Sequence, residues 1–251
     1  MWPGLTFFGH CAKAARTFCL ERTLLASVNA ALPPLPLDYL VIEGNIGAGK
    51  TTLCRLLAER YACDLVLENF EDNPFLPLFY EDQDRYALMV ELFFMTERHT
   101  QMTPLLTQPS LFSKPVLSDY IFTKTWLFAR QTLKPIERKL FRRLFDQLNR
   151  QLPLPRKLLF LHRGVDVLLA NIARRGRDYE RTISAEYLAK IQRTYWDYFR
   201  EEKRYPIVMV DAGDADFEHD RAVLDELVSL VTRPARPGLS VYELGKSGRV
   251  E

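Results

Sequence analysis

Residues 44 to 52 have the composition and spacing of a phosphate-binding loop. Their sequence is Gly-Asn-Ile-Gly-Ala-Gly-Lys-Thr-Thr, which contains the complete pattern G-x-x-x-x-G-K-[ST]. Glycines allow backbone N–H groups to surround a phosphate, and a helix that follows presents its positive end to the same anion. Lys50 is long enough to reach the outer phosphates of ATP, and the Thr51 hydroxyl can bind Mg²⁺. We therefore expect ATP to contact the whole loop: Gly44, Asn45, Ile46, Gly47, Ala48, Gly49, Lys50, Thr51 and Thr52.

The loop alone does not separate kinases from GTPases and motor ATPases. A GTPase should carry an N-K-x-D motif that recognises guanine, and the sequence contains none. A large motor ATPase would need more chain and an acidic pair after a long apolar strand. A phosphotransferase is the class that fits best.

The elements that must position this loop are visible as an alternation of short apolar runs and longer helical patterns. The runs expected to form strands are residues 39–43, 64–68, 115–119, 157–161 and 206–211. The expected helices are residues 53–61, 84–101, 121–131, 135–151, 184–201 and 217–231, and one more that begins at residue 165. This alternation predicts an α/β fold in three layers, with a five-stranded parallel sheet flanked by helices.

Acidic residues stand where several of these strands end. Glu68, Asp119 and Asp211 occupy the last positions of three apolar runs. Ligands of parallel sheets bind beyond the carboxyl ends of the strands. We therefore expect these carboxylates at the same edge of the sheet as the phosphate loop.

Composition bounds the class of protein. The chain has 251 residues and a formal net charge of +2, which is too small to argue for a nucleic-acid or acidic-membrane partner. No apolar stretch reaches the length of a membrane span. The four cysteines fit no zinc pattern, which favours a reducing compartment. We expect a cytoplasmic protein.

The two ends differ from the middle of the chain. Residues 1–36 are basic and end in several prolines, and we interpret them as a disordered or partly helical extension. An unused upstream start and an organelle-targeting leader are alternatives. Residues 233–251 are rich in proline, glycine and charge, and we expect a flexible tail there. Residues 37–232 would form one domain.

From Tyr39 to about Leu230 the order of motifs resembles the deoxyribonucleoside kinases, which share a fold with thymidylate kinases. The motifs are the loop at 43–52, Glu68, the Asn-Pro-Phe-Leu run from residue 73, Phe79-Tyr80, Arg-Gly-Arg-x-Tyr-Glu at 175–180, and residues 211–217. The resemblance implies a P-loop kinase fold with an arginine-rich lid. It also implies ATP-dependent phosphorylation of the 5′-hydroxyl of a deoxyribonucleoside, and commonly a homodimer.

The resemblance assigns roles to the residues that touch the sugar and the phosphates. Glu68 matches the general base, which takes the proton of the 5′-hydroxyl. Arg175 and Arg177 lie on a segment suited to a lid, and their planar guanidinium groups can bind the transferring phosphate through two hydrogen bonds. Tyr80 and Glu180 match residues that hold the 3′-hydroxyl. The segment with Asp216 and Phe217 matches the loop at the adenine of ATP.

The predicted base pocket departs from the family. Glu91 stands where relatives usually have a glutamine, and Arg98 follows two helical turns later on the same face. A carboxylate only accepts hydrogen bonds, so Glu91 suits guanine, which offers N1–H beside an amine; adenine and cytosine, with one amine each, stay open. Arg98 could hold Glu91 or donate to the base. Lys124, where relatives often have an acidic residue, could reach O6 or N7 of a purine.

The third strand also departs from the family. Relatives have Glu-Arg-Ser or Asp-Arg-Ser there, with the acid near Mg²⁺, whereas this chain has Ser118-Asp119-Tyr120. We expect Asp119, rather than Ser118, to join Thr51 at the metal, because it is the one carboxylate at that strand end. The missing arginine leaves the orientation of Glu68 open.

The leading hypothesis is an ATP- and Mg²⁺-dependent deoxynucleoside kinase of nucleotide salvage that prefers purines. A thymidylate-type nucleotide kinase is the nearest alternative, but it should have Asp-Arg-Tyr at the third strand. A non-catalytic nucleotide-binding subunit is the alternative of another class. The amphipathic helices at 84–101 and 135–151 could pair two copies of the chain.

Overall fold

The computed structural model describes residues 33–69, 72–107, 114–245 and 249–250. In this part of the chain a single sheet has the strand order β2-β3-β1-β4-β5-β6-β7. The strands are β1 (Tyr39–Gly44), β2 (Asp64–Val66), β3 (Val116–Ser118), β4 (Lys157–His162), β5 (Pro206–Asp211), β6 (Gly238–Glu243) and β7 (Arg249–Val250). Neighbours from β2 to β6 pair in parallel, and β7 is antiparallel to β6.

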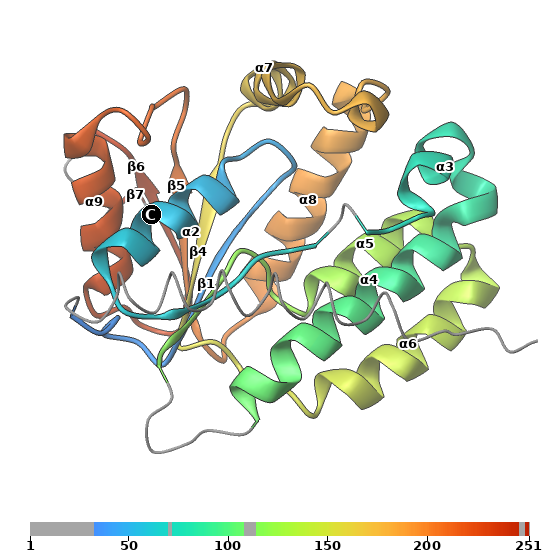
Figure 1. Cartoon of the computed structure of the whole chain (residues 1–251), viewed down its shortest axis with the longest axis horizontal. Helices are drawn as coiled ribbons and strands as arrows, with labels where there is room; N and C mark the ends of the chain where they lie inside the picture. The colour runs from blue at the N-terminus through green and yellow to red at the C-terminus, as the bar shows by residue number, and fades with distance from the viewer. Residues whose placement is uncertain (1–32, 70–71, 108–113, 246–248, 251) are drawn as a thin grey trace, which may run out of the picture.

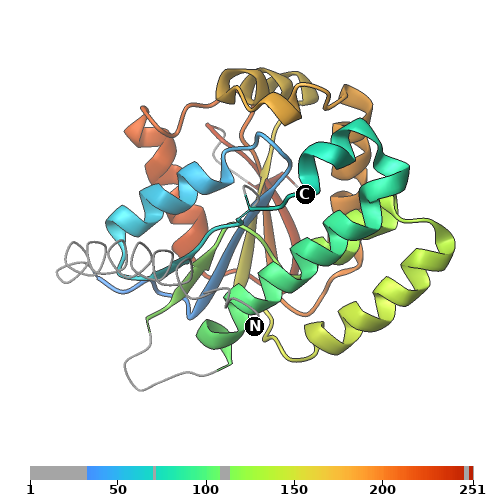
Figure 2. The same cartoon turned by 45° about the vertical axis from the view of Figure 1, so that its right-hand side comes forward.

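Helices cover both faces of this sheet (Figure 1). They are α2 (Lys50–Arg60), α3 (Leu76–Glu81), α4 (Gln83–Leu106), α5 (Lys124–Thr132), α6 (Pro135–Asn149), α7 (Val165–Arg175), α8 (Ala185–Glu201) and α9 (Arg221–Thr232), with a short 3₁₀ turn, η1 (Asp178–Glu180). α2 and α9 lie on one face, whereas α4, α5, α6 and α8 lie on the other. α7 crosses above the carboxyl ends of the strands in both views (Figure 2). In the described residues, no helix is long and apolar enough to cross a lipid bilayer.

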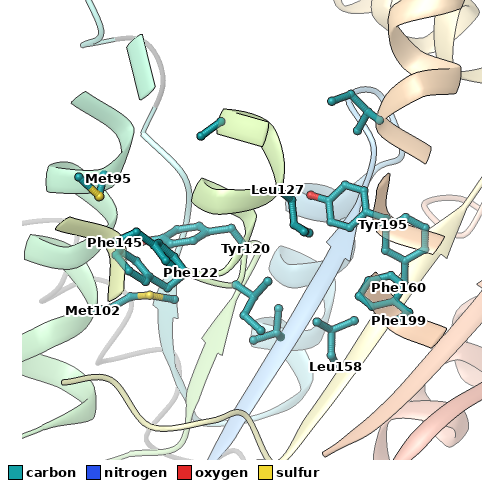
Figure 3. Packing of buried hydrophobic residues seen from close by; sticks show 14 of the residues in the cluster. Met95, Met102, Tyr120, Phe122, Leu127, Phe145, Leu158, Phe160, Tyr195 and Phe199 are labelled. Carbon is teal, nitrogen blue, oxygen red and sulfur yellow. The ribbon is translucent and has the colours of Figure 1, made fainter. Parts of the chain in front are cut away.

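Alternating side chains of the strands divide the core in two. In β1, Tyr39 and Val41 face the cluster under α4, α5 and α8, and Leu40 and Ile42 face the cluster under α2 and α9. The first cluster is rich in aromatic residues, among them Phe160, whose ring lies 5.0 Å from those of Tyr195 and Phe199 (Figure 3). A strand buried on both faces has this near-continuous apolar pattern. These clusters fix the sheet edge where the polar residues gather.

The predicted α/β fold and the five parallel strands are confirmed, but the sheet is larger than expected. Residues 238–243, expected in a flexible tail, form β6 and pair with β5 over its whole length. Alternation in Gly-Leu-Ser-Val-Tyr-Glu is a strand signal that the prolines just before it obscured. The five-strand count and the flexible tail are therefore wrong for this segment. The predicted domain boundary after residue 232 separates β6 and β7 from the sheet to which they belong.

The N-terminal prediction can be compared with the structure over residues 33–36 alone, since residues 1–32 lie outside the described part. Leu35 is buried, and Pro34 forms a β-bridge with Ala62. Ordered packing therefore begins before residue 37.

Capping residues decide where two of the predicted helices begin. Ser184 accepts a hydrogen bond from the Tyr187 N–H, so α8 begins where expected. The last helix begins at residue 221 instead of 217, because the Asp220 carboxylate accepts from the N–H groups of Ala222 and Val223. α3 was not predicted.

Candidate active site

The phosphate loop connects β1 to α2 and has the backbone that its glycines permit. Gly47 and Gly49 have φ angles of 80° and 94°, in the left-handed region that favours glycine. A Cβ atom at Gly49 would lie 2.8 Å from Cζ of Phe217, so this position also needs glycine for space. The loop can therefore keep this backbone conformation only with glycine at these two positions.

Three elements hold the loop in this shape. The buried Asn45 donates through Nδ2 to the Leu188 carbonyl in α8 at 2.9 Å. Asn171 of α7 donates to the Gly47 carbonyl at 2.9 Å. Arg163, just after β4, donates to the Ala48 carbonyl at 3.2 Å. The loop is thus fixed before any ligand arrives, which suits a site that works by positioning.

Arg163 also joins the phosphate loop to the segment at the end of β5. Its guanidinium donates to the carbonyls of Gly213 at 2.9 Å and Ala215 at 2.8 Å, and it lies over the Phe217 ring. Phe217 is buried against Gly49, whereas Asp216 is exposed and bonds to His219. The structure therefore places the predicted adenine segment beside the loop. Sequence reasoning gave Arg163 no role, although a basic residue directly after a strand was a usable signal.

Glu68 lies in a cleft beside the loop, between two cations. Its Oε1 accepts from Arg98 Nε at 2.9 Å and Nη2 at 2.5 Å, and its Oε2 accepts from Lys124 Nζ at 2.6 Å. Burial alone would raise the Glu68 pKa, but the charges of Lys124, Arg98 and Lys50 outweigh it and hold that pKa well below its ordinary value. Glu68 is therefore charged at neutral pH.

This arrangement corrects two expectations. Arg98 binds Glu68 and, at 2.8 Å, Thr125 Oγ1, so its side chain is not the partner of Glu91 that was one alternative. The Lys124 ammonium points to Glu68, so the expected contact with a purine O6 or N7 is not supported. Lys124 instead supplies a second cation at Glu68, beside Arg98. The motifs did not reveal this ion pair, because Lys124 and Glu68 lie far apart in the sequence.

Asp119 connects the phosphate loop to the segment after β2 that carries Glu68. Its Oδ2 accepts from Thr51 Oγ1 at 2.5 Å, and its Oδ1 accepts from the Glu68 N–H at 2.7 Å. Ser118 is fully buried and bonds to the Tyr120 backbone instead. Of the two candidates, Asp119 is the one whose oxygens face Thr51.

Glu43 is a fully buried carboxyl group at the end of β1 that sequence reasoning left without a role. Its Oε1 accepts from the Gly44 N–H at 3.0 Å and its Oε2 from the Ile121 N–H at 3.1 Å. It therefore ties the first residue of the phosphate loop to the segment just after Asp119. Burial, partly offset by Lys124 and Lys50, raises the pKa of Glu43.

The arginine-rich segment follows α7 and reaches over the cleft. Gly176 ends the helix with φ of 72°, and the chain then enters η1. Arg175 donates to Glu180 through Nε at 3.0 Å and Nη2 at 2.5 Å, and Arg177 Nη1 lies 3.5 Å from the same carboxylate. Glu180 is buried, so both guanidinium groups are held at the cleft by one anion.

The cleft continues from the phosphate loop to a half-apolar end. It contains about 800 Å³, including its open mouth. Tyr80 lines it and stacks on Tyr179 at 6.2 Å, and burial raises the pKa of the Tyr80 phenol, so that it stays neutral. Thirteen of the residues proposed from sequence line this one space: Ile46, Gly47, Lys50, Thr51, Glu68, Tyr80, Glu91, Arg98, Asp119, Lys124, Arg175, Arg177 and Glu180.

Glu91 lines the same cleft as the phosphate loop, but its surroundings are more apolar. It is buried, 3 % exposed, and its Oε1 accepts from Thr132 Oγ1 at 2.9 Å. Burial raises the pKa of Glu91 to about 7, although the Arg98 charge and the Thr132 hydrogen bond oppose the shift. Its apolar neighbours Val90, Phe94 and Phe128 also line the cleft and were not predicted.

The fold and this site define a P-loop phosphotransferase. The family model of the deoxynucleoside kinases matches residues 40–234, and the chain belongs to that family. Proteins of this family are kinases that use a nucleoside triphosphate as phosphoryl donor, and this chain is an enzyme of that kind.

Similar proteins include purine deoxynucleoside kinases. A deoxyguanosine kinase of Bacillus subtilis is 28 % identical over 77 % of this chain and 95 % of its own length. A deoxyadenosine kinase of Lactobacillus acidophilus is 26 % identical over 72 % of this chain and 88 % of its own length. The solved structure of a deoxyadenosine kinase from M. mycoides with bound dCTP superposes with a TM-score of 0.63 at 19 % identity, over 76 % of this chain and 96 % of that one, and shows the same fold.

Proposed function

We propose that this chain transfers the terminal phosphoryl group of ATP to the 5′-hydroxyl of a purine deoxyribonucleoside. The observation that carries the proposal is one cleft that contains the phosphate loop with Lys50, the carboxylate of Glu68, and the side chains of Tyr80 and Glu180. A carboxylate and a phenol suit a sugar hydroxyl better than a second phosphate, which would meet like charge at Glu68 and Glu180. Relatives named deoxyguanosine and deoxyadenosine kinases support the choice of a purine.

Glu68 orients the attacking hydroxyl in this proposal. Its low pKa makes it a weak base, so proton removal cannot be its main contribution early in the reaction. The transition state of phosphoryl transfer is loose, and the hydroxyl becomes acidic only as its bond to phosphorus forms. A charged, fixed carboxylate that accepts the hydrogen bond of the 5′-hydroxyl and takes the proton late is sufficient. Arg98 and Lys124 hold Glu68 in that position.

Thr51 and Asp119 are the residues that would hold Mg²⁺. Hydroxyl and carboxylate oxygens are ligands that this ion prefers, and it keeps water and phosphate oxygens at its other positions. Both side chains point to each other at the foot of the phosphate loop, which fits such an ion. When bound, it would neutralise charge on the ATP phosphates. Lys50 lies next to the pair and supplies a further positive charge.

The lid arginines complete the phosphate end of the cleft. Arg175 and Arg177 are held by Glu180, so their charges are offset while ATP is absent. We infer that binding of ATP draws one guanidinium toward the transferring phosphate, while Glu180 turns to the 3′-hydroxyl. Binding both substrates would then form the site in a single step.

A homodimer is part of the proposal. The face of α6 presents Ile136, Leu140 and Leu144, which are 75 %, 56 % and 38 % exposed. These side chains, spaced four residues apart on one helix, give α6 an apolar exposed face of the kind that marks an interface. Light scattering should give twice the mass of one chain for the unmodified protein. The Leu140→Lys variant should give the mass of a single chain.

A steady-state assay with ATP, Mg²⁺ and each of the four deoxynucleosides tests the function. Deoxyguanosine or deoxyadenosine should be converted to the 5′-monophosphate with the highest kcat/KM. Turnover of dTMP with none of any nucleoside would show a nucleotide kinase instead. Nucleotide binding without turnover of either class would show a non-catalytic subunit.

A further inference from the structure

Glu91 is an acid whose two protonation states would have different uses in the cleft. It comes from α4, is almost fully buried, and lines the same space as Glu68. Its Oε1 accepts a hydrogen bond from the Thr132 hydroxyl. Within the described part of the chain, no donor reaches Oε2. Oε2 of Glu91 is therefore available to a ligand, and Oε1 can accept a second hydrogen bond beside the one from Thr132.

The charged groups around Glu91 leave it without a cation of its own. Arg98 on α4 and Lys124 on α5 both bind Glu68, which follows β2. From α8, Tyr187 faces Glu91 with a neutral phenol, because burial raises the pKa of Tyr187. A buried carboxylate that lacks a paired cation is costly to keep charged. Both protonation states of Glu91 are therefore accessible near neutral pH, in agreement with its pKa of about 7.

The two states offer different hydrogen bonds in the same place. A carboxylate presents acceptors only, which match N1–H and the amino group of guanine. The neutral acid presents one donor and one acceptor, as a glutamine does, and these match N1 and the amino group of adenine. When guanine presents N1–H and its amino group, and adenine presents N1 and its amino group, either mismatched pair places two donors or two acceptors opposite each other in a buried site. Such mismatches are rejected strongly because polar groups remain unpaired.

We propose that the protonation state of Glu91 selects the purine: the charged form accepts deoxyguanosine and the neutral form accepts deoxyadenosine. The inference rests on the proposed function, since it assumes that the base of a nucleoside lies against α4. It makes Glu91 a residue of base specificity whose preference changes with pH. The glutamine expected at this position in relatives would have a fixed preference.

The size of the effect follows from proton linkage. If each nucleoside bound a single state, kcat/KM for deoxyguanosine would follow the charged fraction, and that for deoxyadenosine the neutral fraction. Their ratio would then rise about tenfold for each pH unit, whatever the pKa of Glu91. Titration of ATP or of the lid affects both nucleosides alike and cancels in the ratio.

The first test is competition between the two nucleosides from pH 6 to pH 8, with ATP and Mg²⁺ saturating. The ratio of kcat/KM, deoxyguanosine over deoxyadenosine, should rise about a hundredfold across this range. In Glu91→Gln the ratio should not change with pH. A flat ratio in the unmodified enzyme, or a slope that persists in Glu91→Gln, would overturn the inference.

A second variant guards against a Glu91→Gln protein that does not fold. Thr132→Val removes the hydrogen bond to the charged form, so the same slope should appear shifted to higher pH. An unshifted curve would count against the role of Glu91.

Calorimetric binding in two buffers of different ionisation enthalpy separates this inference from the proposed function. At pH 7, deoxyguanosine should release protons on binding and deoxyadenosine should take them up. Absence of turnover at every pH would refute the proposed kinase activity, and the proton count would still decide the role of Glu91. Equal proton counts for the two nucleosides would overturn the role.

Discussion

The cleft contains two buried carboxyl groups whose surroundings give them opposite properties. At the phosphate end, Glu68 contacts Arg98 and Lys124 and its pKa is held well below the ordinary value. At the base end, the one hydrogen bond that Glu91 accepts within the described residues comes from the Thr132 hydroxyl, and its pKa is raised to about 7. Burial raises the pKa of a carboxyl group in both places, so burial does not explain the opposite shifts. The placement of two cations does.

This difference matters because each end has a different task. A fixed negative charge suits a group that must accept the hydrogen bond of a hydroxyl next to cationic phosphate-binding residues. An acid that can change its charge suits recognition of bases that differ in donors and acceptors. One element, α4, carries both Arg98 and Glu91, and so connects the two tasks.

The largest effect is expected at Glu68. Glu68→Gln removes the charge and the proton acceptor but keeps the shape, so kcat should fall by about 1,000-fold, within the range for a general base. ATP binding, measured by calorimetry, should not change. The matched change Glu59→Gln on α2 should leave kcat as it is. A Glu68→Gln enzyme of normal activity would remove Glu68 from the chemistry.

Glu91→Gln should also change how stability depends on pH. A group whose folded pKa is raised contributes stability that is complete below its unfolded pKa and is lost as pH rises through the folded value. For Glu91 the loss falls between about pH 4 and pH 7, and it amounts to about 3 kcal/mol. Urea unfolding at pH 5 and pH 8 should therefore show the variant gaining that much relative to the unmodified protein at the higher pH.

The same experiment contains its own control. Glu97→Gln lies on the same helix but outside the cleft and should not reproduce the gain. If Glu91→Gln had no greater effect at pH 8 than at pH 5, Glu91 would be charged in the folded protein at both pH values.

Asp119→Asn tests the metal side of the phosphate end. The amide keeps the hydrogen bond from the Glu68 N–H but loses the charge that faces Thr51. The Mg²⁺ concentration for half-maximal rate should rise by roughly 30-fold, in the range found when groups around a metal are altered. Asp146→Asn on α6 is the surface control. An unchanged Mg²⁺ dependence would place the ion elsewhere.

The smallest effect is expected for Lys124→Met. Arg98 still holds Oε1 of Glu68, so kcat should fall by only about tenfold for one lost charge partner. Since Lys124 lowers the Glu68 pKa, its removal raises that pKa, and the acidic limb of kcat should move to higher pH. Lys190→Met, on the surface of α8, should do neither. A change in base preference without a shift of the acidic limb would restore the expectation that Lys124 contacts the purine.

Sequence patterns predicted most of the phosphate end. The loop, Glu68 and the Asp119–Thr51 pair follow from strand ends that converge on one edge of a parallel sheet. These positions are fixed by local sequence and by a topology that has few alternatives. The same reasoning applies to the five central strands, each a compact apolar run.

What the sequence did not reveal depends on contacts between distant residues. The pairing of Lys124 with Glu68 joins α5 to β2, and Arg163 joins β4 to two loops. Glu43 looked like one more residue of an apolar strand, yet it bonds to two backbone N–H groups across the sheet edge. β6 was missed because the prolines before it suggested a tail. In each case the partner decides the role, and spacing alone does not specify a partner.

The contrast between the two acids is tested most directly by ¹³C NMR of the protein labelled at the glutamate carboxyl carbon. The signals of the two residues are identified by their absence in Glu68→Gln and Glu91→Gln. Between pH 5 and pH 9 the Glu68 signal should keep the shift of a carboxylate, whereas the Glu91 signal should titrate near pH 7. A Glu91 signal that stays ionised throughout, or a Glu68 signal that titrates in this range, would contradict the account.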